Sequence, residues 1–318
     1  MKRVLSLALA FLLLFGLAGC AAREGAPEYT SERDGPAVVA TLFPAWDFAR
    51  VILGGRGELT LLVPPGAEAH SFEPTPQDLL RIERCDLLIG NGGESEAWLD
   101  TLLDGRSGGF RTLLMLDCVE ALEEEKKEGM QELRGEDDGD GGIEYDEHVW
   151  TSPRNAQKIC EAICGELCAL DPDGAEQYRA NCTDYCAELE KLDAAFREIA
   201  AQGRLDTLIF ADRFPVRYFV EEYGLDYYAA FPGCADDTEP SARTVAFLID
   251  RVREQDVPAV LYIEYSDEKM ADVICADTGC EKRLFHSCHT VSAADLAAGA
   301  DYLDLMWANA GSVKEALG

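Results

Sequence analysis

Residues 171–203 read DPDGAEQYRANCTDYCAELEKLDAAFREIAAQG, and this stretch decides the fold. Its apolar side chains recur at alternating spacings of four and three, which places them along one face of a helix. The pattern predicts a single helix over residues 173–202, about 45 Å long at 1.5 Å per residue. A helix of that length crosses a whole molecule. The apolar stripe consists of Tyr178, Cys182, Tyr185, Leu189, Leu192, Phe196 and Ile199.

On both sides of this helix, short apolar runs alternate with helical patterns, which is typical of parallel sheets covered by helices. We therefore predict an α/β fold with two lobes, each a mostly parallel sheet with flanking helices, bridged by one long rigid helix. The first lobe covers 37–170, the bridging helix 171–203 and the second lobe 204–318. The predicted strands are 37–42, 59–63, 86–89, 112–116, 207–211, 227–231, 259–263 and 282–286, and the predicted helices are 45–53, 77–84, 94–103, 153–170, 173–202, 215–223, 241–255, 267–278 and 302–316.

The N-terminus is typical of an export signal. Lys2 and Arg3 precede an apolar stretch that is too short to span a bilayer comfortably, and residues 17–20 read LAGC. This looks like a bacterial lipobox, which implies that residues 1–19 are removed and that the thiol of Cys20 is acylated. Residues 20–36 then form a polar tether between the lipid and the fold. The alternative is an ordinary signal peptide in which Cys20 is incidental.

The chain is strongly acidic, with 60 Asp and Glu against 28 Lys and Arg and a formal charge of −32. Such a surface repels phosphate backbones, so we expect no nucleic-acid partner and regard cations as the more natural ligands. Residues 120–147 concentrate this charge, with 13 acidic residues against three basic ones. We interpret them as a solvated, mobile loop inserted in the first lobe, with a low-affinity role in collecting cations as the alternative.

Two of the four histidines lie at promising positions. His70 follows the second predicted strand, and His148 directly precedes a predicted helix. Ligands of open parallel sheets gather at the carboxyl ends of the strands, so loop histidines there are candidates for a site. A histidine alone in a loop is ordinarily a surface residue, and the sequence around each one carries the argument.

That sequence resembles a known family. GAEAHSFEPTPQDLLRIERCDLLIGNGGESEAWLD, at residues 66–100, is similar to the first-histidine segment of the bacterial zinc and manganese solute-binding lipoproteins of ABC transporters, the ZnuA-like and TroA-like group. HVWTSPRNAQKI, the long-helix stretch, RYFVEEYGL and YLDLMWAN follow in the family's order, so the resemblance covers about residues 37–317. It implies two α/β lobes bridged by a long helix, with one metal ion held in the cleft between them.

By this resemblance, His70 and His148 stand at the family's first two ligand positions. The third position, six residues before the Phe of a Tyr-Phe pair, is held here by Arg213. A guanidinium has no lone pair to donate, so Arg213 is excluded as a ligand. Asp212 beside it could supply an oxygen instead.

The fourth position falls in the segment RLFHSCHTVS, where we expect His286 to be the ligand. His289, three residues later, is the alternative donor. A carboxylate from Asp212 or Glu264 would complete a four-coordinate site with His70, His148 and His286. Three imidazoles suit Zn²⁺ better than Mn²⁺, so we predict that the bound metal is zinc, with manganese possible.

The resemblance implies capture of the metal outside the cytoplasm and its delivery to a membrane permease driven by an ATPase, by a lipid-anchored chain that we expect to be a monomer and not an enzyme. Because a continuous helix resists bending, we expect capture and release to depend on local loops, especially 120–147. The alternative is a zinc-dependent hydrolase with an open coordination position. H-E-x-x-H and G-x-S-x-G motifs are absent from the sequence, which argues against it.

Cysteine is unexpectedly abundant, with eleven residues beyond Cys20. If residues 153–170 and the long helix fold back on each other, Cys164 comes near Cys182 and Cys160 near Cys186. Disulfides are the first expectation in an exported protein, although eleven is an odd number. A second, thiolate metal site and cysteines buried merely as small apolar residues are the alternatives. A thiol-disulfide redox function is disfavoured because the sequence has no C-x-x-C.

Overall fold

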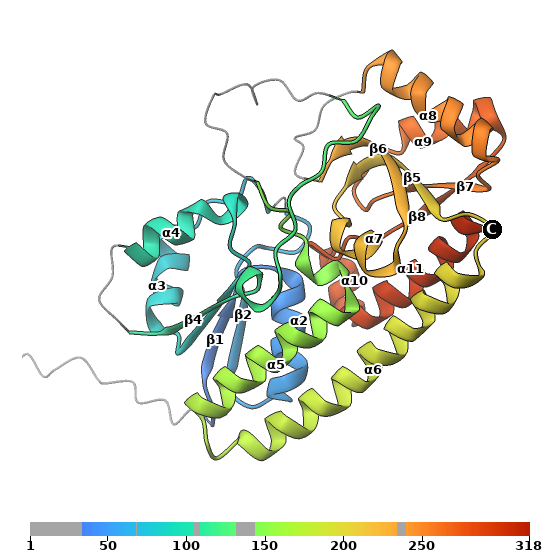
Figure 1. Ribbon diagram of the computed structural model, residues 1–318. Coiled ribbons are helices and arrows are strands. Elements are labelled where there is room, and N and C mark those ends of the chain that lie inside the picture. The colour runs from blue at the N-terminus through green and yellow to red at the C-terminus, as the bar shows by residue number, and fades with distance from the viewer. Residues whose placement is uncertain (1–33, 68, 105–108, 132–143, 234–239) are drawn as a thin grey trace, which may run out of the picture. The chain divides into compact units, whose positions relative to one another are not determined.

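The computed structural model describes residues 34–67, 69–104, 109–131, 144–233 and 240–318 (Figure 1). Residues 34–318 form one compact unit. The predicted signal segment 1–19, Cys20, most of the predicted tether and Cys234 lie outside the described residues.

The first lobe is built on a four-stranded parallel sheet in the order β2-β1-β3-β4. The central strands β1 and β3 are buried along their whole length, which explains their continuous apolar runs. The strands are β1 (Ala37–Ala40), β2 (Glu58–Leu61), β3 (Leu87–Gly90) and β4 (Arg111–Leu114), and the helices are α2 (Phe43–Leu53), α3 (Pro76–Arg84), α4 (Ala97–Asp104), α5 (Pro153–Leu170) and the short 3₁₀ turns η1 (Glu94–Glu96), η2 (Leu116–Cys118) and η3 (Val149–Thr151).

The second lobe repeats this plan with a parallel sheet in the order β6-β5-β7-β8. Its strand β5 is longer than predicted and shifts register between Phe210 and Arg213, close to where the strand ends. The strands are β5 (Thr207–Phe214), β6 (Asp226–Pro232), β7 (Ala259–Tyr262) and β8 (Glu281–Leu284), and the helices are α7 (Arg217–Tyr223), α8 (Ala242–Gln255), α9 (Lys269–Thr278), α10 (Ala293–Ala298) and α11 (Tyr302–Leu317).

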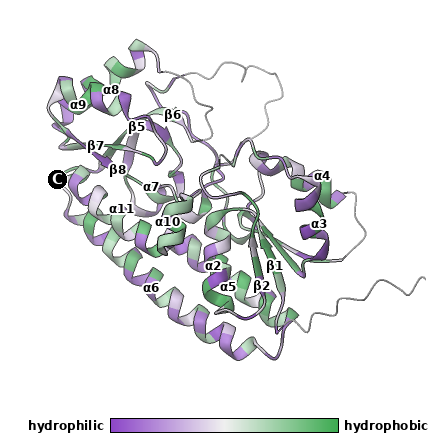
Figure 2. Ribbon diagram, turned by 180° about the vertical axis from the view of Figure 1, so that it is seen from behind, coloured by the Kyte–Doolittle hydropathy of each residue, from purple (hydrophilic) through white to green (hydrophobic). Residues whose placement is uncertain are grey.

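The predicted long helix is α6 (Ala175–Gln202), with 28 residues. It packs against α2 and α5 of the first lobe and against α11 of the second. Its predicted stripe is buried except for Ile199, which is partly buried against the same core. Figure 2 shows hydrophobic and hydrophilic residues alternating along α6, as a helix with one buried face requires. The two-lobe α/β fold with one bridging helix is therefore confirmed.

We had interpreted the acidic segment as a solvated loop. Its described residues, 120–131 and 144–147, are instead partly held by the rest of the protein. The backbone N–H of Leu122 donates to the Tyr218 hydroxyl at 3.1 Å, and the N–H of Gln131 donates to the Ala230 carbonyl at 2.8 Å. Both acceptors belong to the second lobe. Asp146 and Glu147 are buried. The Asp146 carbonyl accepts the Tyr218 hydroxyl at 2.8 Å, so both described stretches of the segment bind the second lobe, where their backbone groups find hydrogen-bond partners.

The cysteines of α5 and α6 meet as their spacing predicts. The Cys182 thiol of α6 donates to the Cys160 carbonyl of α5 at 3.6 Å. All the described cysteines are free thiols, so the expected disulfide staples are absent from the part of the chain that the structure describes. The predicted convergence of the helices is correct, and burial as small apolar side chains accounts for Cys160.

Candidate metal centre

Three histidines converge in one place: His70, from the loop after β2, His148, just before η3, and His289, from the loop after β8. One ring nitrogen of each lies within 4.8 Å of the others. The ring centroids are 5.8 Å apart for His70 and His148, 4.9 Å for His70 and His289, and 5.4 Å for His148 and His289. We call these three residues the histidine cluster. Among the described residues, no other group of His, Cys, Asp and Glu meets the same criterion.

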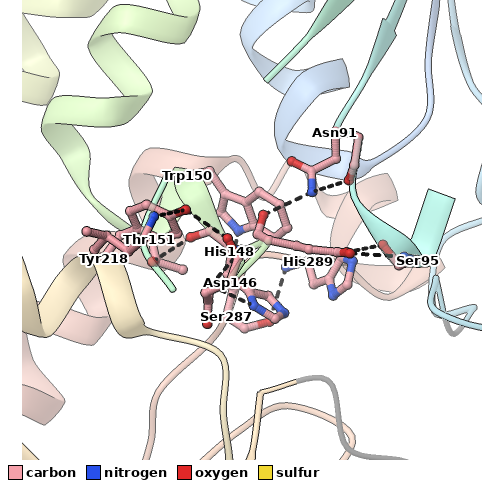
Figure 3. Close-up of polar contacts among 12 residues, drawn as sticks. Asn91, Ser95, Asp146, His148, Trp150, Thr151, Tyr218, Ser287 and His289 are labelled. Carbon is pink, nitrogen blue, oxygen red and sulfur yellow. Dashed lines mark hydrogen bonds and ion pairs between the residues drawn. The ribbon is translucent and has the colours of Figure 1, made fainter. Parts of the chain in front are cut away.

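His148 is fixed by the residues around it (Figure 3). Its backbone N–H donates to Asp146 Oδ1 at 2.8 Å, and its Nδ1 lies 3.2 Å from the same oxygen. Asp146 is held in turn, because its carbonyl accepts the Tyr218 hydroxyl at 2.8 Å. A carboxylate at Nδ1 favours the tautomer that leaves Nε2 free to bind a metal. Burial by itself lowers the pKa of His148, but Asp146 and Glu147 outweigh it and the net pKa is raised.

His289 is positioned by its neighbours and prepared as a neutral donor. Its backbone N–H donates to the Ser287 hydroxyl at 3.2 Å, and its ring lies 5.2 Å from the Trp150 ring. The indole N–H of Trp150 donates to the Ser287 carbonyl at 2.8 Å, which connects the segment of His148 to the segment of His289. Burial, then His70, His148 and Arg213, lower the pKa of His289 well below its ordinary value. A neutral imidazole offers the lone pair that a metal ion needs.

The predicted residue His286 does not join the cluster. Asn309 of α11 holds its backbone on both sides: the N–H of His286 donates to Asn309 Oδ1 at 2.7 Å, and its carbonyl accepts the Asn309 amide at 2.8 Å. The His286 ring accepts the Cys288 backbone N–H at Nδ1, at 3.0 Å. Cys288 has a φ of 61°, and this left-handed turn carries the chain on to His289. The structure therefore places the alternative histidine, His289, where we had expected His286.

The two predicted carboxylates also lie outside the group of converging ligand atoms. Asp212 is buried; its Oδ1 accepts the Arg213 N–H at 2.8 Å, and its Oδ2 lies 3.4 Å from the Ile263 N–H. Burial raises the pKa of Asp212 despite those hydrogen bonds. Glu264 lines the same pocket as the histidines, but it accepts the Ser287 N–H at 2.7 Å and the Ser287 hydroxyl. Both carboxylates are thus engaged by backbone donors.

The histidine cluster opens into a pocket of about 200 Å³. We call it the site pocket. Arg213, Glu264 and Tyr265 line it together with the three histidines. Small residues, Gly66, Ala67 and Gly233, make up much of the remaining lining. A Cβ on Gly233 would lie 3.2 Å from Cε1 of His148, so glycine lets the backbone pass close to that ring.

The donor set fits a divalent transition metal. Three nitrogen donors, one of them oriented by a carboxylate, are typical of zinc ligation, whereas magnesium and calcium prefer oxygen donors. The sequence pointed to His70 and His148 and kept His289 as the alternative. It missed Asp146, although a carboxylate two residues before a candidate histidine ligand is a usable signal. Because residues 120–147 contain 13 acidic residues, the sequence offered no reason to single out Asp146 among them.

Two parallel-sheet lobes with an imidazole cluster in a pocket define a two-lobe α/β metal-binding protein. The family described as "Zinc-uptake complex component A periplasmic" matches residues 38–316. The chain belongs to this family. It is a family of metal-binding transport components that work with ABC transporters outside the cytoplasm, and not an enzyme family.

Individual relatives agree with this assignment. The chain is 29% identical over 312 residues to the high-affinity zinc uptake system protein ZnuA of Bacillus subtilis, covering 97% of this chain and 95% of that protein. It is 27% identical over 318 residues to the zinc-binding lipoprotein AdcA of Streptococcus pneumoniae, of which it spans 61%.

Solved structures share the fold. The metal-dependent lipoprotein YcdH from Bacillus subtilis matches with a TM-score of 0.73 and 28% identity, over 89% of this chain and 100% of that chain. The Zn(II)-bound ZnuA-like domain of Streptococcus pneumoniae AdcA matches with a TM-score of 0.72 and 24% identity, over 89% of this chain and 99% of that domain. Within the described residues of the present chain, no helix is both long and apolar enough to cross a membrane.

Proposed function

We propose that this protein captures Zn²⁺ on His70, His148 and His289 outside the cytoplasm and delivers it to the permease of an ABC transporter driven by an ATPase. The observation that carries the proposal is the convergence of three ring nitrogens within 4.8 Å at the edge of a pocket. Membership of a zinc-uptake family and the names of the relatives ZnuA and AdcA support zinc as the cargo.

The chemistry of the donors favours zinc over manganese. Imidazole nitrogens suit Zn²⁺, whereas Mn²⁺ prefers carboxylates and water, and the nearby carboxylates of Asp212 and Glu264 are engaged elsewhere. Manganese remains the competing cargo, with a weaker fit to this donor set. Acylation of Cys20 would hold the protein at the membrane, close to its permease. We expect the protein to act as a monomer.

The test is a titration of metal-free protein, from Ala21 onward so that the whole unit 34–318 is present, with Zn²⁺ and Mn²⁺ in parallel. We expect one tight zinc equivalent and at least tenfold weaker manganese binding. His289→Ala should lower zinc affinity at least a hundredfold. His286→Ala is the matched control, because it removes an imidazole three positions away that does not join the cluster, and it should bind zinc nearly as the parent does.

The opposite result, with zinc affinity lost in His286→Ala and kept in His289→Ala, would overturn the ligand assignment. Titration with Co²⁺ separates the histidine cluster from the cysteines. Thiolate ligands give an intense near-ultraviolet charge-transfer band, and imidazole ligands do not. We expect that band to be absent at one equivalent, and its presence would move the site to the cysteines of α5 and α6.

A further inference from the structure

Arg213 places a permanent positive charge in a pocket that we propose to hold a cation. It lies near the end of β5 and lines the site pocket together with all three histidines. It is close enough to His289 to contribute to the lowered pKa of that ring. A guanidinium cannot be deprotonated in a protein and cannot ligate a metal, so its charge adds to that of the captured ion.

The histidine cluster supplies three imidazole donors, none of which brings a negative charge to the metal. Zinc ordinarily takes four ligands, so a fourth ligand position remains to be filled. The carboxylates of Asp212 and Glu264 accept the backbone N–H groups of Arg213 and Ser287, and neither brings an oxygen into the group of converging ligand atoms. Within the described part of the chain, then, no carboxylate oxygen lies with the three ring nitrogens.

The pocket provides both room and a recognition group for an anion from solution. Gly66, Ala67 and Gly233 are small residues that line the same pocket as Arg213. Guanidinium binds planar carboxylate-like groups through two parallel N–H···O hydrogen bonds. It carries five N–H donors, so Arg213 can engage an anion along one edge while it keeps a protein partner on another.

We propose that Arg213 recruits a small planar oxyanion, of the carboxylate or bicarbonate class, which completes the coordination of the captured ion. One oxygen of the anion binds the metal, and the guanidinium of Arg213 holds the other. The protein then takes its cargo as an ion pair rather than as a bare cation. This inference rests on the proposed function, because it requires metal on the histidine cluster.

Thermodynamic linkage makes the proposal measurable. If the anion raises the affinity of the site for the metal, the metal must raise the affinity for the anion by the same factor. Zinc is titrated into the protein in a perchlorate medium, which coordinates metals poorly, and again with added acetate or added bicarbonate. The variants are Arg213→Gln and, as the matched control, Arg217→Gln, whose parent side chain pairs with Glu221 on α7 outside the site pocket.

We expect acetate or bicarbonate to raise zinc affinity at least tenfold in the parent protein and in Arg217→Gln, and less than twofold in Arg213→Gln. The anion that raises zinc affinity more shows whether the site prefers a carboxylate or bicarbonate. Circular dichroism and the thermal midpoint establish that Arg213→Gln is folded. With Co²⁺ in place of Zn²⁺, the visible absorption bands should shift on addition of the anion in the parent and stay unchanged in Arg213→Gln.

Two results would overturn the inference: zinc affinity that is independent of both anions in the parent protein, or an equal enhancement in Arg213→Gln. Glu264→Gln tests whether the Glu264 carboxylate, rather than an anion from solution, fills the fourth coordination position. We expect the anion effect to persist in that variant, whereas a large loss of zinc affinity in perchlorate would assign the fourth position to Glu264. Absence of zinc binding in every medium contradicts the proposed function itself and is thereby distinguished from failure of the anion proposal.

Discussion

Asp146 contacts His148 twice, once through the backbone N–H and once near Nδ1. The carboxylate is buried, and the backbone carbonyl of the same residue is held by the Tyr218 hydroxyl. Such a partner fixes both the tautomer and the orientation of a metal-binding imidazole, and it increases the basicity of the ring. The orientation of His148 is therefore established before any ion arrives.

Replacing this carboxylate tests that role. We expect Asp146→Asn to weaken zinc binding about 10- to 100-fold, the usual effect of losing a hydrogen-bond partner behind a metal ligand. Competition titration with a zinc chelator gives the affinity. Asp117→Asn makes the same chemical change at an exposed position and should match the parent. Equal affinities in Asp146→Asn and the parent would show that Asp146 does not orient the ring.

At the residue scale, the sequence predicted two of the three converging histidines. It favoured His286 over His289, whereas the structure brings His289 into the cluster, because the outcome depends on contacts from a distant helix. Asn309 binds the backbone of His286, and the positive φ of Cys288 turns the chain between the two histidines. A left-handed cysteine is uncommon and leaves no mark in the local sequence.

At the scale of elements, an ion pair ties α2, α5 and α6 together where the helical pair turns. Asp171, after the end of α5, accepts Arg56 Nε at 2.6 Å and the Tyr178 hydroxyl at 2.7 Å. Arg56, followed by Tyr178 and the Gly174 N–H, lowers the pKa of Asp171 to about 2. The contact joins the loop after α2 to the first turn of α6.

This lowered pKa makes stability depend on pH in a definite direction. An unfolded aspartate has a pKa of about 3.9, so the contribution of Asp171 is full above that pH and is lost as the pH falls toward 2. We expect Asp171→Asn to be about 1–2 kcal/mol less stable than the parent at pH 6, with the gap shrinking toward pH 3. Urea unfolding at several pH values measures this. Asp173→Asn, exposed on the same turn, should show no such trend.

Cys160 lies at the interface of α5 and α6 and is fully buried. Burial is the main cause that raises the pKa of its thiol well above the ordinary value, so it remains protonated and packs as a small apolar group. We expect Cys160→Ser to lower the free energy of unfolding by about 1–3 kcal/mol, because a hydroxyl is costlier to bury. Cys168→Ser, at a partly exposed position, is the control in urea denaturation. Equal losses in the two variants would contradict the packing role.

The elements themselves were largely predictable, since strand runs and helix periodicity are local signals. The helix predicted at 153–170 is α5 with the same first and last residues, and the predicted apolar stripe of α6 is the face that the fold buries. The six-residue α10 was missed because it has no buried residue to produce a periodic pattern. Its start does carry a signal, the capping of Asp295 N–H by Ser292, which a Ser-x-x-Asp search would have found.

At the scale of the whole molecule, one helix packs against elements of both lobes, and the docking of the acidic segment reinforces that connection. α6 contacts α2 and α5 on one side of the fold and α11 on the other. The backbone N–H groups of Leu122 and Gln131 bind the second lobe in the first described stretch of the segment, and the Asp146 carbonyl accepts the Tyr218 hydroxyl in the second stretch. No composition argument could have predicted this attachment, because the segment looks uniformly solvated in sequence while its partners come from α7 and β6.

The histidine cluster draws on three segments that are far apart in the chain. His70 and His148 are separated by 78 positions, and His148 and His289 by 141. An ion bound to all three, as proposed, acts as a removable cross-link that closes two long loops. Zinc at a hundred times its dissociation constant should add about 2.7 kcal/mol to the free energy of unfolding, which calorimetry would detect as a higher thermal midpoint. His289→Ala should show no rise; an equal rise there would contradict the cross-link.

The same cross-link gives the empty and loaded proteins different lifetimes. Proteases cleave the transiently opened chain, and a bound ion makes that opening rarer in proportion to its occupancy. Delivery of the cargo therefore also removes protection from the carrier. A cell starved of zinc would hold a pool of carriers that turns over faster, and the metal would set the abundance of the protein that collects it.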